Sequence, residues 1–165
     1  MSVAHFIRLG LLLVSCADLA LSAQCPTGWL HFQESCYKIE RNPLKTWPDA
    51  KQSCVNQQAH LAIVMTLEEN SFLRNETMKI GEAGRQYWMD GTDMATEGTW
   101  IWDKTGELFE VNDWAPNEPN QNGGQEDCLS IFSTLGYHWN DEHCNSPQAY
   151  ICEKGDSSSG TGVVG

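Results

Sequence analysis

Oxygen-bearing side chains gather in two short parts of the chain, and the chemistry open to them is the binding of a hard cation. Residues 112–127 carry almost no aliphatic side chain, and a second polar stretch lies at residues 139–141. Calcium takes about six to eight oxygen ligands from carboxylates, amides and carbonyls, without a rigid geometric demand. Several side chains in these segments could serve as ligands, among them these five: Glu118, Asn120, Glu126, Asn140 and Asp141.

The overall charge does not decide between a cation site and a merely acidic surface. The chain has a formal net charge of −12, which suits hard cations but also suits a surface kept acidic for solubility. The same charge makes nucleic acid and anionic membranes poor partners. The position of the acidic residues must therefore separate these readings.

An enzyme is the third alternative, because two histidines and two acids lie close together near the carboxyl end. His138 and His143 are five residues apart, whereas a zinc-binding helix places its histidines four apart. The two acids are Asp141 and Glu142. No motif of an activated serine or cysteine accompanies these histidines and acids. We therefore expect ordinary exposed histidines and no enzymatic activity.

The first residues predict export from the cell. An arginine precedes an apolar run at residues 9–14, and small residues follow it, which is the pattern of a cleaved signal peptide. Cleavage after Ala17 or after Ser22 fits, and the second is preferred, giving a signal peptide at residues 1–22. Asp18 argues against a continuous membrane span, so we expect a secreted, extracellular protein without membrane insertion.

Cysteine usage agrees with an oxidising compartment. Either cleavage removes Cys16 and leaves six cysteines, an even number that predicts disulfides in an exported chain. Six cysteines allow 15 different pairings, so their number alone leaves the connectivity open. The six are Cys25, Cys36, Cys54, Cys128, Cys144 and Cys152.

The elements that must position these residues form an α+β pattern. A hairpin is expected within residues 25–39, a first helix at residues 48–57, and a second helix from Thr66, where a Thr-x-x-Glu capping box begins. Asn75 begins a glycosylation sequon that marks exposed surface. Later elements are strands near residues 87–89, 99–102, 128–132, 136–141 and 149–154, followed by a flexible tail at residues 155–165.

Several of these motifs together resemble the C-type lectin-like domain, in its long form with an amino-terminal hairpin. The carriers are Cys-Pro-x-Gly-Trp from Cys25, Trp-Met-Asp-Gly from Trp88 in place of the family's Trp-Ile-Gly-Leu, Glu-Pro-Asn from Glu118, Trp-Asn-Asp from Trp139, and the six cysteines. The resemblance assigns residues 23–154 to one lectin domain. Within this family, the sequence resembles soluble invertebrate lectins, including the perlucin type.

The resemblance implies a disulfide framework, a cis peptide and a calcium site. The five candidate ligands above correspond to the family's sugar-binding calcium site, and the Glu118–Pro119 peptide is expected to be cis. A second, weaker calcium site is implied at Asp93, Glu97, the Glu126 carbonyl and Asp127, but Gln121 stands where a further carboxylate is usual. The implied disulfides are Cys25–Cys36, Cys54–Cys152 and Cys128–Cys144.

The order Glu-Pro-Asn also implies a class of sugar. In the family this order favours equatorial 3- and 4-hydroxyls, as in mannose, whereas Gln-Pro-Asp favours galactose. We expect a calcium-dependent lectin for mannose-type glycans on microbial or cell surfaces, with Trp114 and Trp139 used for packing. The alternative is an acidic extracellular matrix or biomineral-associated protein that uses the same fold without binding sugar.

Overall fold

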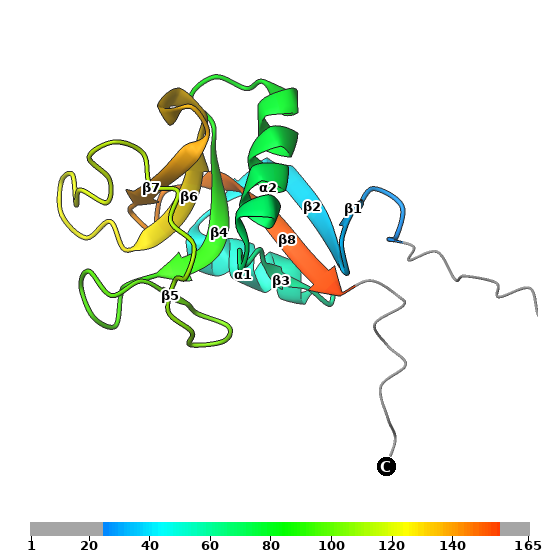
Figure 1. Ribbon diagram of the computed structural model, residues 1–165, viewed down its shortest axis with the longest axis horizontal. Coiled ribbons are helices and arrows are strands. Elements are labelled where there is room, and N and C mark those ends of the chain that lie inside the picture. Colours follow the sequence, from blue (N-terminus) through cyan, green and yellow to red (C-terminus); the bar gives the residue numbers. More distant parts are fainter. Residues whose placement is uncertain (1–24, 156–165) are drawn as a thin grey trace, which may run out of the picture.

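A computed structural model describes residues 25–155 (Figure 1). The expected signal peptide at residues 1–22 lies outside the described part, and so does the expected tail except for Gly155. That glycine is the last residue of a strand, whereas the sequence predicted that it belongs to the flexible tail.

One mixed sheet organises the domain. Its order is β1-β2-β8-β4-β6-β7, with β3 paired to β8 and β5 paired to β4. The described pairs are antiparallel except β4 with β8, which run parallel. The strands are β1 (Leu30–Phe32), β2 (Ser35–Lys45), β3 (His60–Leu61), β4 (Gln86–Thr92), β5 (Ile101–Trp102), β6 (Cys128–Phe132), β7 (His138–Glu142) and β8 (Gln148–Gly155).

The first helix, α1 (Trp47–Val55), begins one residue earlier and ends two residues earlier than expected. At its start Trp47 is buried, and its indole N–H donates to the Met89 carbonyl at 2.8 Å. At its end the chain passes through Gln58 with φ 56°, a left-handed conformation that cannot continue a helix.

The second helix, α2 (Leu67–Ile80), begins at the predicted cap, where the Thr66 hydroxyl accepts the Glu69 N–H at 3.1 Å. The other half of the expected capping box differs. The Glu69 carboxylate accepts the N–H of Met65 at 2.7 Å, so it fixes the residue before the cap. Gly81, with φ 69°, ends the helix in the left-handed conformation that glycine tolerates. A short 3-10 turn, η1 (Ser133–Leu135), precedes β7.

An aromatic core lies between the sheet and the long loop that follows β5. Trp102 and Trp139 are fully buried, and the ring of Phe109 stacks on Trp102 at 4.2 Å. Gly91 in β4 lies directly beneath Phe109, because a Cβ there would come within 2.4 Å of that ring. The glycine of the Trp-Met-Asp-Gly motif therefore makes room for the loop to pack on the sheet.

Three disulfides tie the elements together, in the pairs that the family resemblance implies. Cys25–Cys36 closes the amino-terminal hairpin. Cys54–Cys152 joins α1 to β8 across 98 residues, and Cys128–Cys144 joins the start of β6 to the segment after β7. The last of these joins Cys128, which directly follows the polar loop at residues 112–127, to the segment after the second polar stretch.

Candidate functional site

The polar loop lies at one end of the molecule, beside β6 and β7 (Figure 1). Two backbone hydrogen bonds hold its first part on β7: the Ala115 N–H donates to the Trp139 carbonyl, and the Trp139 N–H donates to the Asp113 carbonyl, each at 2.9 Å. Because β7 also carries residues 140 and 141, this attachment brings the two polar segments of the sequence to the same place.

Glu118 is the most constrained acid of the loop. It is half-buried, its peptide bond to Pro119 is cis, and its Oε2 atom is buried without a hydrogen-bond partner. Burial raises the pKa of Glu118 to about 7, with further contributions from a hydrogen bond and the negative charge of Asp141 and from the charge of Glu126. A buried carboxylate oxygen beside two other acids is a position suited to a cation.

Asp141 fastens the loop to β7. Its buried carboxylate accepts the Asn120 N–H, at 3.1 and 2.9 Å from its two oxygens, and the Gln121 N–H at 2.9 Å. The neighbouring Asn140 is also buried, and its side-chain amide donates to the backbone carbonyl of Asp141. Four of the five predicted ligands, Glu118, Asn120, Asn140 and Asp141, are thus brought into direct contact.

Glu126, the fifth predicted ligand, is buried on the other side of the loop. Its carboxylate accepts the Asn122 N–H at 2.5 Å. Its pKa is raised, chiefly by burial and then by the charges of Asp141 and Glu142, against the opposing effect of the Asn122 hydrogen bond. Three acids of like charge therefore share one region of low exposure.

The chemistry of this donor set fits a calcium ion. Carboxylate and amide oxygens are its preferred ligands, and a divalent cation would relieve the repulsion among Glu118, Glu126 and Asp141. Within residues 25–155, no group of three or more His, Cys, Asp or Glu side chains has already converged into a metal-binding arrangement. The backbone N–H groups described above hold two of the acids instead, so an arriving ion would exchange with these hydrogen bonds.

The predicted second site surrounds Gln121. Its side-chain N–H group donates to both carboxylate oxygens of Glu97, at 3.0 and 3.1 Å, and to the Glu126 carbonyl at 3.3 Å. Asp93 lies next to Asp127, with its N–H donating to the Asp127 carbonyl at 3.3 Å, and its Oδ1 is buried without a partner. The amide donor of Gln121 therefore contacts oxygens that a second cation would need.

A network of side-chain hydrogen bonds, which the sequence did not predict, supports β7. His138 Nδ1 lies 2.8 Å from an Asp113 carboxylate oxygen, and the other Asp113 oxygen accepts the Asn70 side-chain N–H at 2.7 Å. Asn70 in turn accepts the indole N–H of Trp139 at 2.8 Å. These residues lie far apart in the sequence, so no local sequence pattern predicts that they contact one another.

The sequence predicted that His138 and His143 are exposed, and this prediction is wrong. Both are half-buried, because His138 is held by Asp113 and His143 Nδ1 lies 3.2 Å from the Gln125 carbonyl. His143 thus contacts the polar loop, while His138 belongs to the network that supports β7.

The two tryptophans beside the site are used in packing. Trp139 is fully buried and meets Trp114 edge-to-face at 5.9 Å. Trp114 is half-buried and packs on Trp100 at 4.7 Å. The packing interpretation of Trp139 is therefore correct, since a fully buried ring offers no face to a sugar.

Comparison with known proteins places this fold and site in a family. Residues 43–154 match the model of the lectin C-type domain, and the chain belongs to the C-type lectin family. It is 36% identical over 131 residues to perlucin from Haliotis laevigata, covering 79% of this chain and 83% of perlucin. It is 35% identical over 153 residues to a C-type lectin of Thrasops jacksonii, a lectoxin, covering 90% of this chain and 95% of the lectoxin.

Comparison with solved structures gives the same fold. The C-type lectin CEL-I from Cucumaria echinata is 30% identical, with a TM-score of 0.71 over 79% of this chain and 96% of CEL-I. A calcium-independent type II antifreeze protein is 28% identical, with a TM-score of 0.69 over 81% and 95%. C-type lectin domains generally bind carbohydrate rather than catalyse reactions, which supports the expectation that this protein is not an enzyme.

No helix within residues 25–155 has the length and apolar character needed to cross a membrane. The α+β fold, the two helices, the three disulfides and the family itself are thus established.

Proposed function

We propose that this protein is a secreted, calcium-dependent lectin that binds mannose-type glycans through equatorial 3- and 4-hydroxyls. The observation that carries the proposal is the placement of Glu118 and Asn120 on either side of Pro119, directly against Asp141. One Glu118 oxygen there is buried without a partner. Such an oxygen is costly unless a cation or a hydroxyl group meets it.

Each residue of the site has a role that follows from its side chain. Calcium, when bound, supplies the coordination positions at which two neighbouring sugar hydroxyls are held. The carboxylates of Glu118 and Glu126 accept hydrogen bonds from those hydroxyls, and the amides of Asn120 and Asn140 donate to them. Asp141 provides charge from a buried position and keeps residues 120 and 121 on β7.

The mannose class is supported by the Glu-Pro-Asn order and by one solved relative. The carbohydrate-recognition domain of cow CD23, solved in the presence of a GlcNAc2Man3 oligosaccharide, is 28% identical, with a TM-score of 0.69 over 81% and 97%. A glycan of the same kind is the ligand to test here.

The second set, Asp93, Glu97 and Asp127, forms a weaker calcium site in this proposal. Asp93 is buried, and burial raises its pKa, with the nearby charges of Glu97 and Asp127 acting in the same direction. Gln121 contributes an amide where a carboxylate would add charge, which lowers the affinity for a cation.

The compartment and biological role follow from the same features. Three disulfides suit an oxidising, extracellular environment, in keeping with a signal peptide at residues 1–22. A single shallow site binds one glycan weakly, so microbial recognition or agglutination requires several sites held together.

A second candidate function is an acidic matrix or mineral-associated protein. It is favoured by the net charge of −12 and by the likeness to a calcium-independent antifreeze protein. Binding of that kind would depend on charge spread over the surface, and not on Glu118 or Asn120.

The deciding experiment is retention of the purified protein on mannose-agarose in calcium, with chelator and galactose-agarose as controls. Retention on mannose that chelator abolishes is the expected result. Glu118→Gln should lose it, whereas Glu34→Gln, which removes the same charge from an exposed turn between β1 and β2, should keep it. Retention on neither resin would favour the matrix or mineral-associated alternative.

A further inference from the structure

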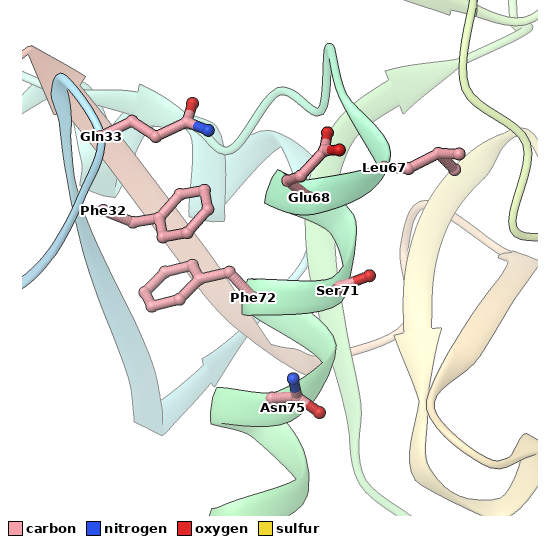
Figure 2. A pocket seen from close by; sticks show the side chains of 7 residues that line it. All are labelled: Phe32, Gln33, Leu67, Glu68, Ser71, Phe72 and Asn75. Atoms are coloured by element: carbon pink, nitrogen blue, oxygen red, sulfur yellow. The ribbon is translucent and has the colours of Figure 1, made fainter.

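A groove of about 540 Å³ lies between the β1–β2 hairpin and helix α2. None of the residues that line it belongs to the calcium or sugar site. Figure 2 shows the two elements that border it, with Phe72 of α2 pointing toward Phe32 of β1. Its lining residues are Phe32, Gln33, Leu67, Glu68, Ser71, Phe72 and Asn75.

Two stacked aromatic rings form one wall of the groove. The rings of Phe32 and Phe72 are 4.4 Å apart and nearly parallel, with 11° between their planes. Both remain only partly buried, and Leu67 on the same helix is 62% exposed. The groove therefore leaves apolar surface open to solvent, which is favourable to cover.

Asn75 lies at the rim of this aromatic wall. It follows Phe72 by three residues and Ser71 by four, so the three side chains are neighbours on one face of α2. Figure 2 shows Asn75 on the turn next to Phe72, and its side chain is exposed. Asn75 is also the first residue of the sequon Asn75-Glu76-Thr77.

The third residue of the sequon has a different environment. Thr77 is fully buried, and its hydroxyl donates to the Leu73 and Arg74 carbonyls of its own helix, at 3.0 and 2.9 Å. A transferase that must recognise this threonine cannot reach it in the folded domain. Modification must therefore precede the folding of α2, while the exposed Asn75 leaves room for the sugar afterwards.

We propose that Asn75 carries an N-linked glycan whose first sugar packs in this groove against Phe32 and Phe72. The C–H face of the sugar covers the rings, and its acetamide and hydroxyls meet the polar side chains of Gln33 and Ser71. Because the glycan is covalently attached at the rim, its effective concentration in the groove is high. The inference rests on the secretory part of the proposed function and not on its sugar specificity.

The glycan is attached to Asn75 by a glycosyl transfer. The Asn75 amide nitrogen forms a bond to C1 of the sugar of a lipid-linked diphosphate oligosaccharide. The bond between C1 and the phosphate oxygen breaks, the lipid diphosphate leaves with the electron pair, and the amide loses one proton. The donor and the transferase are supplied by the secretory pathway of the cell.

The test compares stability with and without the sugar in two backgrounds. The full chain and its Phe32→Leu variant are secreted from a eukaryotic host, each with and without Asn75→Gln, and glycans are trimmed to a single N-acetylglucosamine. We expect glycopeptide mass spectrometry to find the sugar on Asn75. The sugar should raise the melting temperature by about 3 °C in the native background and by less than about 1 °C in the Phe32→Leu background, where one ring is missing.

Two controls keep the outcome decisive. Thr77→Ser retains the sequon and the buried hydroxyl, so it should keep the glycan. Proton NMR of the trimmed protein should show contacts between the sugar and the rings of Phe32 and Phe72, which tests the packing even if the Phe32→Leu variant folds poorly.

An unmodified Asn75 in the secreted protein, or equal stabilisation in both backgrounds without sugar–ring contacts, would overturn the inference and leave the groove for a protein partner. Mannose retention, measured on the same samples, should not depend on Asn75. Absence of mannose retention both with and without Asn75→Gln would therefore count against the proposed function alone.

Discussion

Exchanging the carboxylate at position 118 with the amide at position 120 should change the sugar that the site selects. In the proposed site, Glu118 accepts hydrogen bonds from the sugar on one side of the ion and Asn120 donates on the other. The double variant Glu118→Gln, Asn120→Asp reverses that order while keeping size and net charge.

We expect its retention to move from mannose-agarose to galactose-agarose, still dependent on calcium. Competitive elution with the free sugars measures the change. Unchanged mannose retention would mean that these two residues do not contact the sugar.

Gln121 should control the number of ions bound. Its amide donates to Glu97 and to the Glu126 carbonyl, so it occupies oxygens that a second cation needs. Gln121→Glu replaces this donor with a ligand and adds charge, and we expect at least a tenfold rise in affinity for a second calcium, or about 1.4 kcal/mol.

Calorimetric titration with calcium gives the stoichiometry and both affinities. Gln125→Glu, in the same loop and exposed, is the matched control and should add charge without this gain. Equal effects of the two variants would assign the gain to net charge alone.

Calcium affinity should fall as the medium becomes mildly acidic. The ion requires ionised carboxylates, and burial together with Asp141 raises the pKa of Glu118 to about 7. Protons therefore compete with calcium from neutral pH downward, and not only near the ordinary value of 4.5.

Below pH 7 we expect the calcium affinity to fall by up to about tenfold per pH unit for each proton taken up. Release of bound mannose should follow. Retention on mannose-agarose between pH 8 and pH 5 at fixed calcium measures this, and retention that persists at pH 5 would contradict it.

Among the elements, the junction of β2, β3 and β8 contains a half-buried acid that opposes folding at alkaline pH. Glu153 on β8 accepts the Ser35 hydroxyl at 2.8 Å and the Ile63 N–H at 3.0 Å. Burial, the largest cause, raises its pKa to about 7 from an ordinary value of 4.5. Between these values the folded state binds more protons than the unfolded state, so stability falls as pH rises.

Glu153→Gln should therefore stabilise the domain at pH 8, by up to about 3 kcal/mol, and should give no gain at pH 4.5. Urea unfolding at both pH values measures the difference. Glu34→Gln, at an exposed position, should show no such dependence, and an equal gain for both variants would rule out burial as the cause.

Local signals in the sequence were sufficient for some elements and not for others. The Thr66 cap and the glycine after α2 are encoded within a few residues, so the start of that helix was predicted correctly. The end of α1 depends on the conformation of Gln58, which its residue type does not announce.

The same distinction holds at the site. The motifs around Glu118 and Asp141 identified the candidate ligands, and the structure brings them into contact. The link from His138 through Asp113 to Asn70 joins residues tens of positions apart, and only the folded topology creates it. Family motifs thus identified the candidate ligands, whereas the residues that hold these side chains in place could be found only from the structure.

For the molecule as a whole, the long-range disulfide should contribute most to stability. Cys54–Cys152 spans 98 residues and Cys25–Cys36 spans 11. If a disulfide acts by restricting the unfolded chain, its effect grows with the logarithm of the loop it closes.

Replacing the first pair by alanines should cost about 2 kcal/mol more than replacing the second pair. Chemical denaturation of the two double variants gives the comparison. A larger loss from the hairpin pair would indicate that native packing, and not chain entropy, sets the order.

The pairing of β2 with β8 determines how the domain can be displayed. Ser35 lies opposite Gly155, and the Cys25–Cys36 disulfide holds the amino-terminal end of the described domain near the same place. Figure 1 shows this end on the side away from the polar loop. A scaffold attached through either end would therefore hold several domains with their loops facing outward, in the orientation needed to grip a glycan-covered surface at many points.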